Sequence, residues 1–97
     1  MTFTVLLEFQ AKDGAEDVPG ILREVLSQTR AFAGNEGIEV LIDDADPSRF
    51  LVVEKWESVP ARDAYVAWRA TPDGANRLGA IMASAPSFRT FEDSVPI

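Results

Sequence analysis

Four segments of this chain have the pattern of strands, by alternation of side chains or by a β-prone run, and two longer segments with helical periodicity separate them. The four are residues 3–10, 38–43, 49–57 and 87–93. A period of two is typical of strands, whereas recurrence every three or four residues is typical of helices that pack by one face. A chain of 97 residues fills only one core. We therefore expect a single domain, residues 1–97, in the order strand, helix, strand, strand, helix, strand.

The first helix is expected to run from a cap at Asp17 to about Phe32. Asp17 suits an N-cap, and Pro19 fits the first helical turn. Gly34 and Gly37 are expected to end the helix. The apolar inner face consists of Ile21, Leu22, Val25, Leu26 and Thr29.

The second helix is expected to run from a cap at Ser58 to about Ala70, with Pro60 in its first turn. Its predicted inner face is formed by Ala61, Ala64, Tyr65 and Trp68. Residues 71–74 break the helix, and a further short helix follows. Its inner face consists of Leu78, Ile81, Met82 and Ala85.

The acidic residues between the second and third strands are the one candidate metal site in the sequence. Counting an EF-hand loop from Asp44 places Arg49 where the glycine belongs and Lys55 where the bidentate Glu belongs. Counting from Asp43 places Glu54 correctly but fails at other positions. The acidic cluster therefore indicates a hairpin turn, and we predict no metal site.

The strand order predicts a ferredoxin-like α+β fold, an antiparallel βαββαβ sheet with its helices on one face. The odd residues of segment 3–10 are all apolar and are expected to face the helices. Apolar residues also remain on the opposite face, at Leu6, Leu41, Val53 and Phe91. Covering that face stabilises the fold by about 25 cal/mol per Å2. We therefore expect a homodimer; scattered apolar surface on a monomer is the alternative.

Composition argues against two classes of partner. Nine basic and sixteen acidic residues give a formal net charge of -7, which repels nucleic acid and anionic lipid surfaces. The apolar N-terminal run has no basic region before it and is interrupted by Glu8, so it indicates a strand rather than a signal peptide. We expect no nucleic-acid or membrane partner. The absence of cysteine is compatible with a soluble, cytoplasmic protein.

The absence of histidine limits the chemistry of the chain. Acid-base catalysis must then use carboxylates, Tyr, Lys or the acidity of the substrate itself. No phosphate-binding glycine loop and no GxSxG nucleophile motif occurs.

The most specific stretch is FLVVEKWES at residues 50–58, followed by a helix that contains ARDAY. Together with the Gly-rich end of the first helix, it resembles the antibiotic biosynthesis monooxygenase domain family, in which a strand reading E-x-W-E-S precedes a helix with a His. The resemblance extends from the first strand to Phe91. It implies a dimeric α+β barrel with a pocket between helices and sheet in each subunit.

Members of that family include cofactor-independent monooxygenases acting on polyketide anthrones or quinols, haem-degrading enzymes, an isomerase of a signalling metabolite and proteins of unknown role. Two positions depart from the family pattern. Tyr65 stands where the helix commonly carries His, and Leu7 stands where haem degraders have a pocket Asn. Haem iron would then have no His ligand, and we expect no haem or other cofactor.

Two pocket candidates lie on the third strand, where Glu54 and Trp56 share the face toward the helices. A carboxylate there must be paired or have a raised pKa, and a raised pKa suits a proton acceptor. Glu54 is therefore a catalytic candidate, with pairing to an arginine as the alternative. Trp56 is a candidate for stacking an aromatic substrate, with core filling as the alternative.

The other candidates come from the helical segments and the first strand. Tyr65 is a catalytic candidate because its phenol can donate a hydrogen bond to a substrate oxygen, and Trp68 shares its helical face. Arg69 and Asn76 are candidates for holding an oxyanion at the pocket mouth. Leu7 is expected to line the pocket from the first strand. Ordinary packing or a solvated surface role is the alternative for these residues.

The leading hypothesis is a cofactor-independent monooxygenase that binds a small phenol, quinol or polyketide-type substrate and removes a proton from it with Glu54 or a water. The first alternative is a non-catalytic dimer that binds a small hydrophobic ligand or has a regulatory role. The second alternative is an isomerase of a small oxygenated metabolite. An open pocket with convergent polar groups would favour an enzyme; a pocket packed shut would favour a binding protein.

Overall fold

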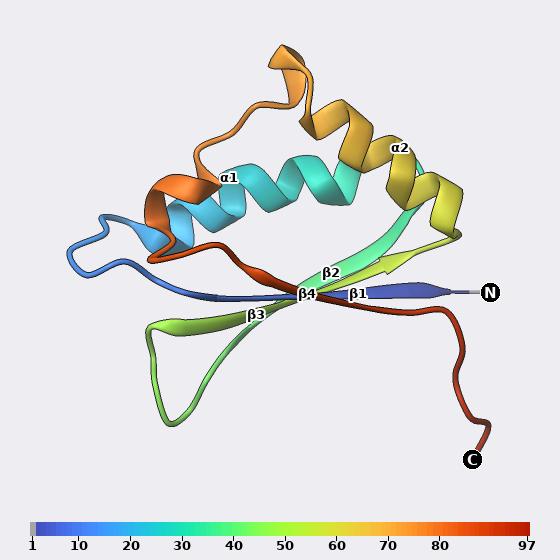
Figure 1. The fold of residues 1–97 in the computed structure, drawn as a ribbon, viewed down its shortest axis with the longest axis horizontal. Helices are drawn as coiled ribbons and strands as arrows, with labels where there is room; N and C mark the ends of the chain where they lie inside the picture. The colour runs from blue at the N-terminus through green and yellow to red at the C-terminus, as the bar shows by residue number, and fades with distance from the viewer. Residues whose placement is uncertain (1) are drawn as a thin grey trace.

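The computed structural model describes residues 2–97, which form an antiparallel sheet with the helices on one face (Figure 1). The elements, in chain order, are β1 (Phe3–Gln10), α1 (Val18–Ala31), β2 (Asn35–Ile42), β3 (Arg49–Trp56), α2 (Val59–Arg69), η1 (Pro72–Gly74), η2 (Leu78–Ile81) and β4 (Ser87–Phe91). The order across the sheet is β2-β3-β1-β4. The predicted α+β fold is thereby confirmed. Within this described part, no helix is long and apolar enough to cross a membrane.

The inner strand β1 determines which residues of its neighbours face the helices. Val5 lies opposite Glu54 of β3 and Thr90 of β4, and directly opposed residues of paired strands share a face. All four odd residues of β1 between Phe3 and Phe9 are buried, as predicted. Glu54 therefore faces the helices.

Two clusters of buried apolar side chains fill the space between the sheet and the helices. The first lies beneath α1 and includes Leu22, Val25 and Val52. The second includes Val5, Trp56 and Tyr65, and it lies beneath α2. The core is therefore divided along the sheet, with one helix over each part.

Helix α1 has the predicted cap and the predicted buried face. The side chain of Asp17 accepts a hydrogen bond from the backbone N–H of Gly20 at 3.1 Å. At the other end the chain leaves the helix at Phe32 and passes through Gly34, whose φ of 92° lies in the left-handed region. One expectation is wrong, because Gly37 does not end the helix but lies inside β2, beside an irregularity in the strand register.

Helix α2 buries most of the predicted stripe, because Ala61 and Trp68 pack against the cluster that contains Tyr65. Tyr65 is buried, but Ala64, expected on the inner face, is exposed. The half-buried positions beside Tyr65 include Arg62 and Arg69. The predicted inner face is therefore confirmed at three of its four positions, and two arginines lie beside it.

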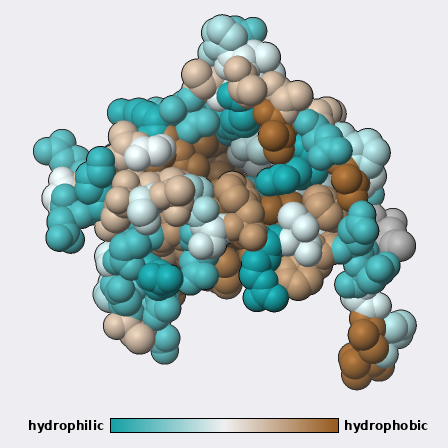
Figure 2. Space-filling view, in the orientation of Figure 1, coloured by the Kyte–Doolittle hydropathy of each residue, from teal (hydrophilic) through white to brown (hydrophobic). Residues whose placement is uncertain are grey.

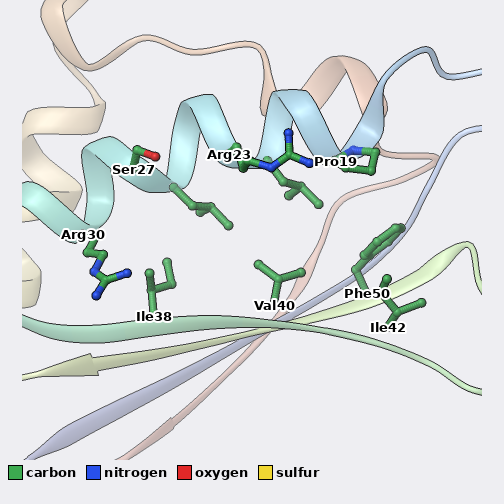
Figure 3. A pocket seen from close by; sticks show the side chains of 10 residues that line it. Pro19, Arg23, Ser27, Arg30, Ile38, Val40, Ile42 and Phe50 are labelled. Atoms are coloured by element: carbon green, nitrogen blue, oxygen red, sulfur yellow. The ribbon is translucent and has the colours of Figure 1, made fainter.

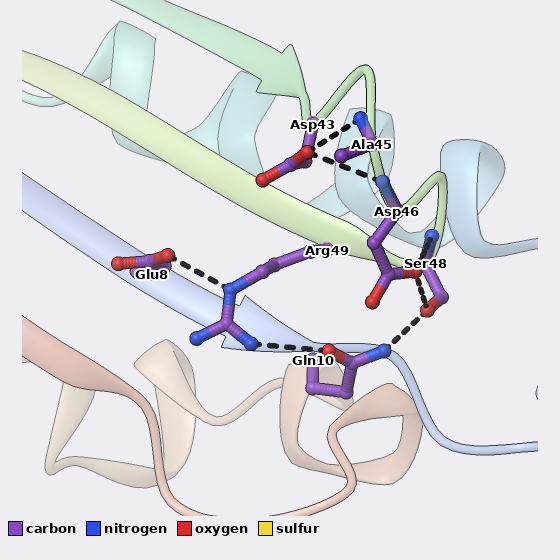
Figure 4. Close-up of polar contacts among 7 residues, drawn as sticks. All are labelled: Glu8, Gln10, Asp43, Ala45, Asp46, Ser48 and Arg49. Atoms are coloured by element: carbon purple, nitrogen blue, oxygen red, sulfur yellow. Dashed lines mark hydrogen bonds and ion pairs between the residues drawn. The ribbon is translucent and has the colours of Figure 1, made fainter.

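The loop between β2 and β3 has the predicted turn role (Figure 4). A carboxylate oxygen of Asp43 accepts the backbone N–H groups of Ala45 and Asp46 at 2.7 and 3.1 Å. Asp46 in turn accepts the backbone N–H and the hydroxyl of Ser48 at 3.0 and 2.6 Å. These hydrogen bonds from Ser48 lower the pKa of Asp46. The carboxylates that suggested a cation site thus bind the backbone of their own loop.

The sheet face opposite the helices, called the outer face below, carries the predicted apolar residues. Leu6 lies directly opposite Val53 in the β1–β3 ladder. Leu41 and Phe91 are 43% and 38% exposed. An ion pair between Glu8 and Arg49, at 3.0 Å, lies toward one end of this face (Figure 4). The outer face therefore has an apolar centre beside charged side chains.

Candidate functional site

A cavity of about 340 Å3 lies between the helices and the sheet, and we call it the helix–sheet pocket. Hydrophobic atoms are visible inside a hollow between these layers in Figure 2. The polar lining residues are Glu54, Arg62, Tyr65, Arg69 and Asn76. The apolar ones are Leu7, Val25, Leu26, Val66, Leu78 and Phe88. Five of the seven residues predicted for the site therefore line one pocket.

Glu54 places a carboxyl group on the floor of this pocket. Its side chain points inward from β3 and is 4% exposed. One carboxylate oxygen accepts the indole N–H of Trp56 at 3.0 Å. Burial raises the pKa of Glu54, although the Trp56 hydrogen bond and the charges of Arg62 and Arg69 act in the opposite direction. Glu54 therefore has the character expected of a proton acceptor in an apolar site.

Arg62 brings a positive charge to the same pocket. Its guanidinium lies over the ring of Phe88, with 5.7 Å between the guanidinium carbon and the ring centroid. Its Nε is buried and has no hydrogen-bond partner among residues 2–97. A buried N–H without an acceptor is costly, and this one belongs to a residue of the pocket lining.

Tyr65 and Arg69 form a hydrogen-bonded network with α1. The hydroxyl of Tyr65 lies 2.7 Å from the hydroxyl of Thr29 and accepts the Nε–H of Arg69 at 2.7 Å. The two Nη atoms of Arg69 donate four more hydrogen bonds, at 2.9 to 3.2 Å. Their acceptors are Gln28, Gly74, Val25 and Thr29.

Arg69 thus uses all five of its N–H donors within the protein. Through these hydrogen bonds it joins α2 to the middle of α1 and to the short turn η1. The guanidinium also stacks near the ring of Trp68, at 4.8 Å from its centroid. In this arrangement Arg69 holds the two helices together and contributes charge, rather than a free donor, to the pocket.

The remaining predicted residues occupy different places. Leu7 lines the pocket and Asn76 lies at its mouth, where the side-chain amide oxygen of Asn76 accepts the backbone N–H of Leu78 at 2.9 Å. Trp56 and Trp68 are not among the lining residues. They pack with Tyr65 in the cluster beneath α2, and the centroids of Trp56 and Tyr65 are 5.0 Å apart. The structure therefore places both tryptophans beside the pocket.

Sequence reasoning missed Arg62 and Phe88 as pocket residues. Arg62, Tyr65 and Arg69 follow one another at helical spacing on α2, so they share one side of the helix. That spacing is a usable signal, because long arginine stems pack against apolar surface. No comparable sequence pattern identifies Phe88 as a pocket residue. Its place follows from the pairing of β4 with β1, in which Phe88 lies opposite Leu7.

A family model described as Antibiotic biosynthesis monooxygenase matches residues 2–76 of the chain. This range includes β1 through Asn76 and therefore every predicted pocket residue. No curated protein matches the chain.

Solved structures with similar folds cover nearly the whole chain. A variant of SnoaB, a cofactor-independent oxygenase from Streptomyces nogalater, has a TM-score of 0.82 at 14% identity, over 99% of this chain and 96% of that chain. A conserved protein from Methanosarcina mazei has a TM-score of 0.81 at 12% identity, over 97% and 94%. A structure titled antibiotic biosynthesis monooxygenase has a TM-score of 0.75 at 21% identity, over 99% and 100%. At these sequence identities, the comparison shows that the folds are alike.

Replacing Arg69 by Lys is expected to lower the free energy of unfolding by about 2 kcal/mol or more, because an ammonium has three donors and no planar fork to replace five hydrogen bonds. Urea denaturation measures this change. Arg77→Lys is the control, since Arg77 pairs with Glu24 in an exposed salt bridge and its loss is expected to change the midpoint little. Equal losses in both variants would contradict the structural role of Arg69.

The raised pKa of Glu54 predicts a pH dependence of stability. The folded state keeps this proton at pH values where the unfolded chain has lost it. The free energy of unfolding should therefore fall as pH rises from about 4.5 through the raised native pKa. The free energy of unfolding of the Glu54→Gln variant should not show this decrease, because the glutamine amide does not titrate.

Urea denaturation of both proteins from about pH 4.5 to pH 8 measures the difference. Asp46 and Glu24 have lowered pKa values in the folded protein, and both proteins contain them, so their effect cancels in the comparison. Parallel stability curves for the two proteins would show that the Glu54 pKa is not raised.

Proposed function

Because this chain belongs to the antibiotic biosynthesis monooxygenase family, we propose that it is a cofactor-independent monooxygenase acting on a small aromatic quinol or phenol. The buried Glu54, with its raised pKa in a largely apolar pocket, is the observation that supports this most. The likeness in fold to an enzyme described as a cofactor-independent oxygenase supports the same class of reaction.

The volume of the pocket supports a small substrate. Sites for small molecules typically enclose about 300–1,000 Å3, and the helix–sheet pocket encloses about 340 Å3. Its apolar walls and the ring of Phe88 suit a flat aromatic body. A substrate of one or two rings is therefore favoured over a large polyketide.

In the proposed reaction, the Glu54 carboxylate takes the proton of a substrate hydroxyl, and the charge of Arg62 stabilises the resulting anion. Dioxygen then forms a bond to a ring carbon of the anion, giving a hydroperoxide. Loss of water leaves a carbonyl at that carbon, so a quinol and O2 become a hydroxyquinone and water. The substrate supplies all the electrons, and one oxygen atom stays in the product.

Tyr65 and Asn76 have supporting places in this scheme. The Tyr65 hydroxyl is already held by Thr29 and Arg69, so its orientation is fixed before a substrate arrives. Asn76 lies at the mouth, where its side-chain N–H is only weakly engaged, at 3.5 Å from the carbonyl of Gly74. Trp56 acts through Glu54, whose carboxylate it orients by the indole hydrogen bond.

A non-catalytic ligand-binding or regulatory dimer is the second candidate. Two observations favour it: the Trp56 hydrogen bond already occupies one oxygen of Glu54, and Arg69 has no donor left for a substrate. An isomerase of a small oxygenated metabolite would use the same carboxyl to move a proton without O2. Consumption of O2 separates the first proposal from both alternatives.

We also infer that the outer face packs against a second copy of the chain. Val53 and Leu6 are opposed at its centre, and Leu51, Leu41 and Phe91 lie around them. Burial of this surface against an equivalent sheet removes apolar area from water on both subunits. The helix–sheet pocket lies on the other side of the sheet, so each subunit keeps its own pocket.

The monooxygenase proposal predicts O2 uptake with members of a panel of benzohydroquinones and naphthohydroquinones, which have one or two rings. Glu54→Gln should lower kcat by about 100-fold or more, because an amide cannot accept the substrate proton. An oxygen electrode and product analysis measure the rate and the hydroxyquinone. Glu16→Gln, at an exposed position before α1, is the control and should leave the rate unchanged.

Two results would count against that proposal. Equal rates for Glu54→Gln and the parent protein would remove the role of the carboxyl. Tight binding of phenols without any O2 uptake would favour the ligand-binding alternative.

Val53→Lys should weaken the proposed dimer by about 100-fold or more in Kd, because it buries an ammonium in an apolar interface. Glu39 lies directly opposite Val53 in β2, so the new ammonium can pair with it in the free subunit, and both charges must be desolvated when the dimer forms. Sedimentation equilibrium at micromolar concentration measures the change. Ala67→Lys, on the exposed side of α2, is the control. A parent protein that sediments as a monomer would refute the dimer.

A further inference from the structure

A second cavity of about 330 Å3 lies between α1 and β2, and we call it the α1–β2 groove (Figure 3). Its wall on the sheet side is apolar and consists of Ile38, Val40, Ile42 and Phe50. It shares only Leu26 with the helix–sheet pocket. The groove is therefore a separate cavity, with no assigned role in the proposed reaction.

The helices leave this edge of the sheet partly uncovered. Val40 lies directly opposite Val52 of β3, which is buried under the helices. Ile42 lies opposite the buried Phe50 in the same ladder. Both side chains therefore point to the helix side of the sheet, yet they are 37% and 61% exposed. Apolar side chains gathered in a cavity at the surface are a common mark of a ligand site.

The groove is on the opposite side of the sheet from the outer face. In the dimer inferred above, the outer face meets the second copy, so the groove stays open to solvent in the dimer as well as in the monomer. An occupant from solution can therefore enter it in either state.

The groove is long and narrow. Figure 3 shows Pro19 of α1 above Phe50 and Ile42 at one end. At the other end, Arg30 lies above Ile38. Pro19 and Arg30 are about 16 Å apart along the helix axis, so the mean cross-section of the groove is about 20 Å2. An extended alkyl chain fits this width and length.

One positive side chain extends across an end of the groove. Arg30 leaves the last turn of α1, and its guanidinium points toward Ile38 of β2 (Figure 3). Arg30 takes part in neither ion pair and in no side-chain hydrogen bond within residues 2–97. Its guanidinium donors are therefore free to bind a carboxylate. The full charge of Arg30 outweighs the partial negative charge of about half an elementary charge at the C-terminus of α1.

The charge at the other end of the groove has the opposite sign. Ile42 is followed directly by the loop of residues 43–48, which contains three aspartates. A negatively charged head group is repelled there and attracted at Arg30. The charges therefore favour one direction for an amphipathic anion, with its head group at Arg30 and its apolar part toward Ile42.

We propose that the α1–β2 groove binds an unbranched alkyl carboxylate, the chemistry of a medium-chain fatty acid. The carboxylate pairs with Arg30, and the chain lies along Ile38, Val40 and Ile42. An extended chain of about ten carbons spans most of the groove, because each C–C bond of about 1.5 Å advances the chain by slightly less than its length. A body of two fused rings is shorter and would leave much of the groove empty. This inference rests neither on the proposed reaction nor on the dimer.

Titration with decanoate, followed by the NMR shifts of the backbone amides, tests the site. Saturable shifts are expected at residues 38–42 and along α1, at concentrations below those at which decanoate forms micelles. Arg30→Gln should raise the Kd by about 10-fold or more, because it removes the charge that binds the carboxylate. Arg77→Gln, which removes an exposed charge outside the groove, is the control and should leave the Kd unchanged.

Two neighbouring substitutions on β2 test the apolar wall. Val40→Asp should raise the Kd for decanoate by about 10-fold or more, because it places a carboxylate beside the alkyl chain. Leu41→Asp introduces the same side chain at the next position, where it points to the outer face, and should leave the Kd unchanged. Equal effects of the two substitutions would show that the chain does not lie in the groove.

The remaining outcomes are equally decisive. Absence of saturable binding would overturn the inference. Shifts at Glu54 and Tyr65 in place of those on β2 would put decanoate in the helix–sheet pocket and refute the groove as its site. The compound 2-naphthoate has the same charge on two fused rings and should bind in the groove about 10-fold more weakly; equal binding would contradict the assignment of an alkyl chain. Oxygen uptake tests the proposed reaction separately, since Arg30 and Val40 do not line the helix–sheet pocket.

Discussion

The arrangement of the sheet depends on which side chains of β1 point toward the helices. This strand pairs with both β3 and β4, so its alternation decides which residues of three strands lie under the helices. A shift of one residue would turn Val5 outward and would also move Glu54 out of the interior. The four buried odd residues of β1 make that shift costly, because each would lose its packing against the helices. The position of the carboxyl in the pocket is thus a consequence of hydrophobic burial elsewhere.

Two arginines of α2 line the helix–sheet pocket, and they differ in their hydrogen bonding. Arg69 donates five hydrogen bonds within the protein. Arg62, in contrast, has a buried Nε–H without a partner among the described residues. The first arginine stabilises the two-helix layer, and the second adds an unsatisfied charge beside Glu54. An unpartnered buried N–H is rare in folded proteins, so Arg62 is the polar group of the lining whose place the packing explains least.

The sequence predicted the strands, the helix caps and the face on which Glu54 lies, because these follow from local periodicity and capping chemistry. It failed where the answer depends on how one element is rotated against another. Ala64 was expected on the inner face and Arg62 was not, since single-sequence reasoning treats charged residues as solvent-facing. Arginine stems pack well against apolar surface, so Arg62 takes a half-buried place beside Tyr65 while Ala64 is exposed. The aromatic character of Trp56 and Trp68 suggested substrate contact, but their rings complete the core beside the pocket.

The pairing of β1 with β4 has a consequence for how the chain reaches this fold. Thr4 of β1 pairs with Phe91 of β4. The first strand to be synthesised therefore completes its hydrogen bonding only when one of the last segments has been made. Contacts between residues so far apart in sequence slow folding, because the intervening chain must close a large loop first. Until β4 arrives, one edge of β1 is an open template for pairing with other nascent chains. The same topology that shelters the pocket therefore delays completion of the sheet until the chain is almost fully made.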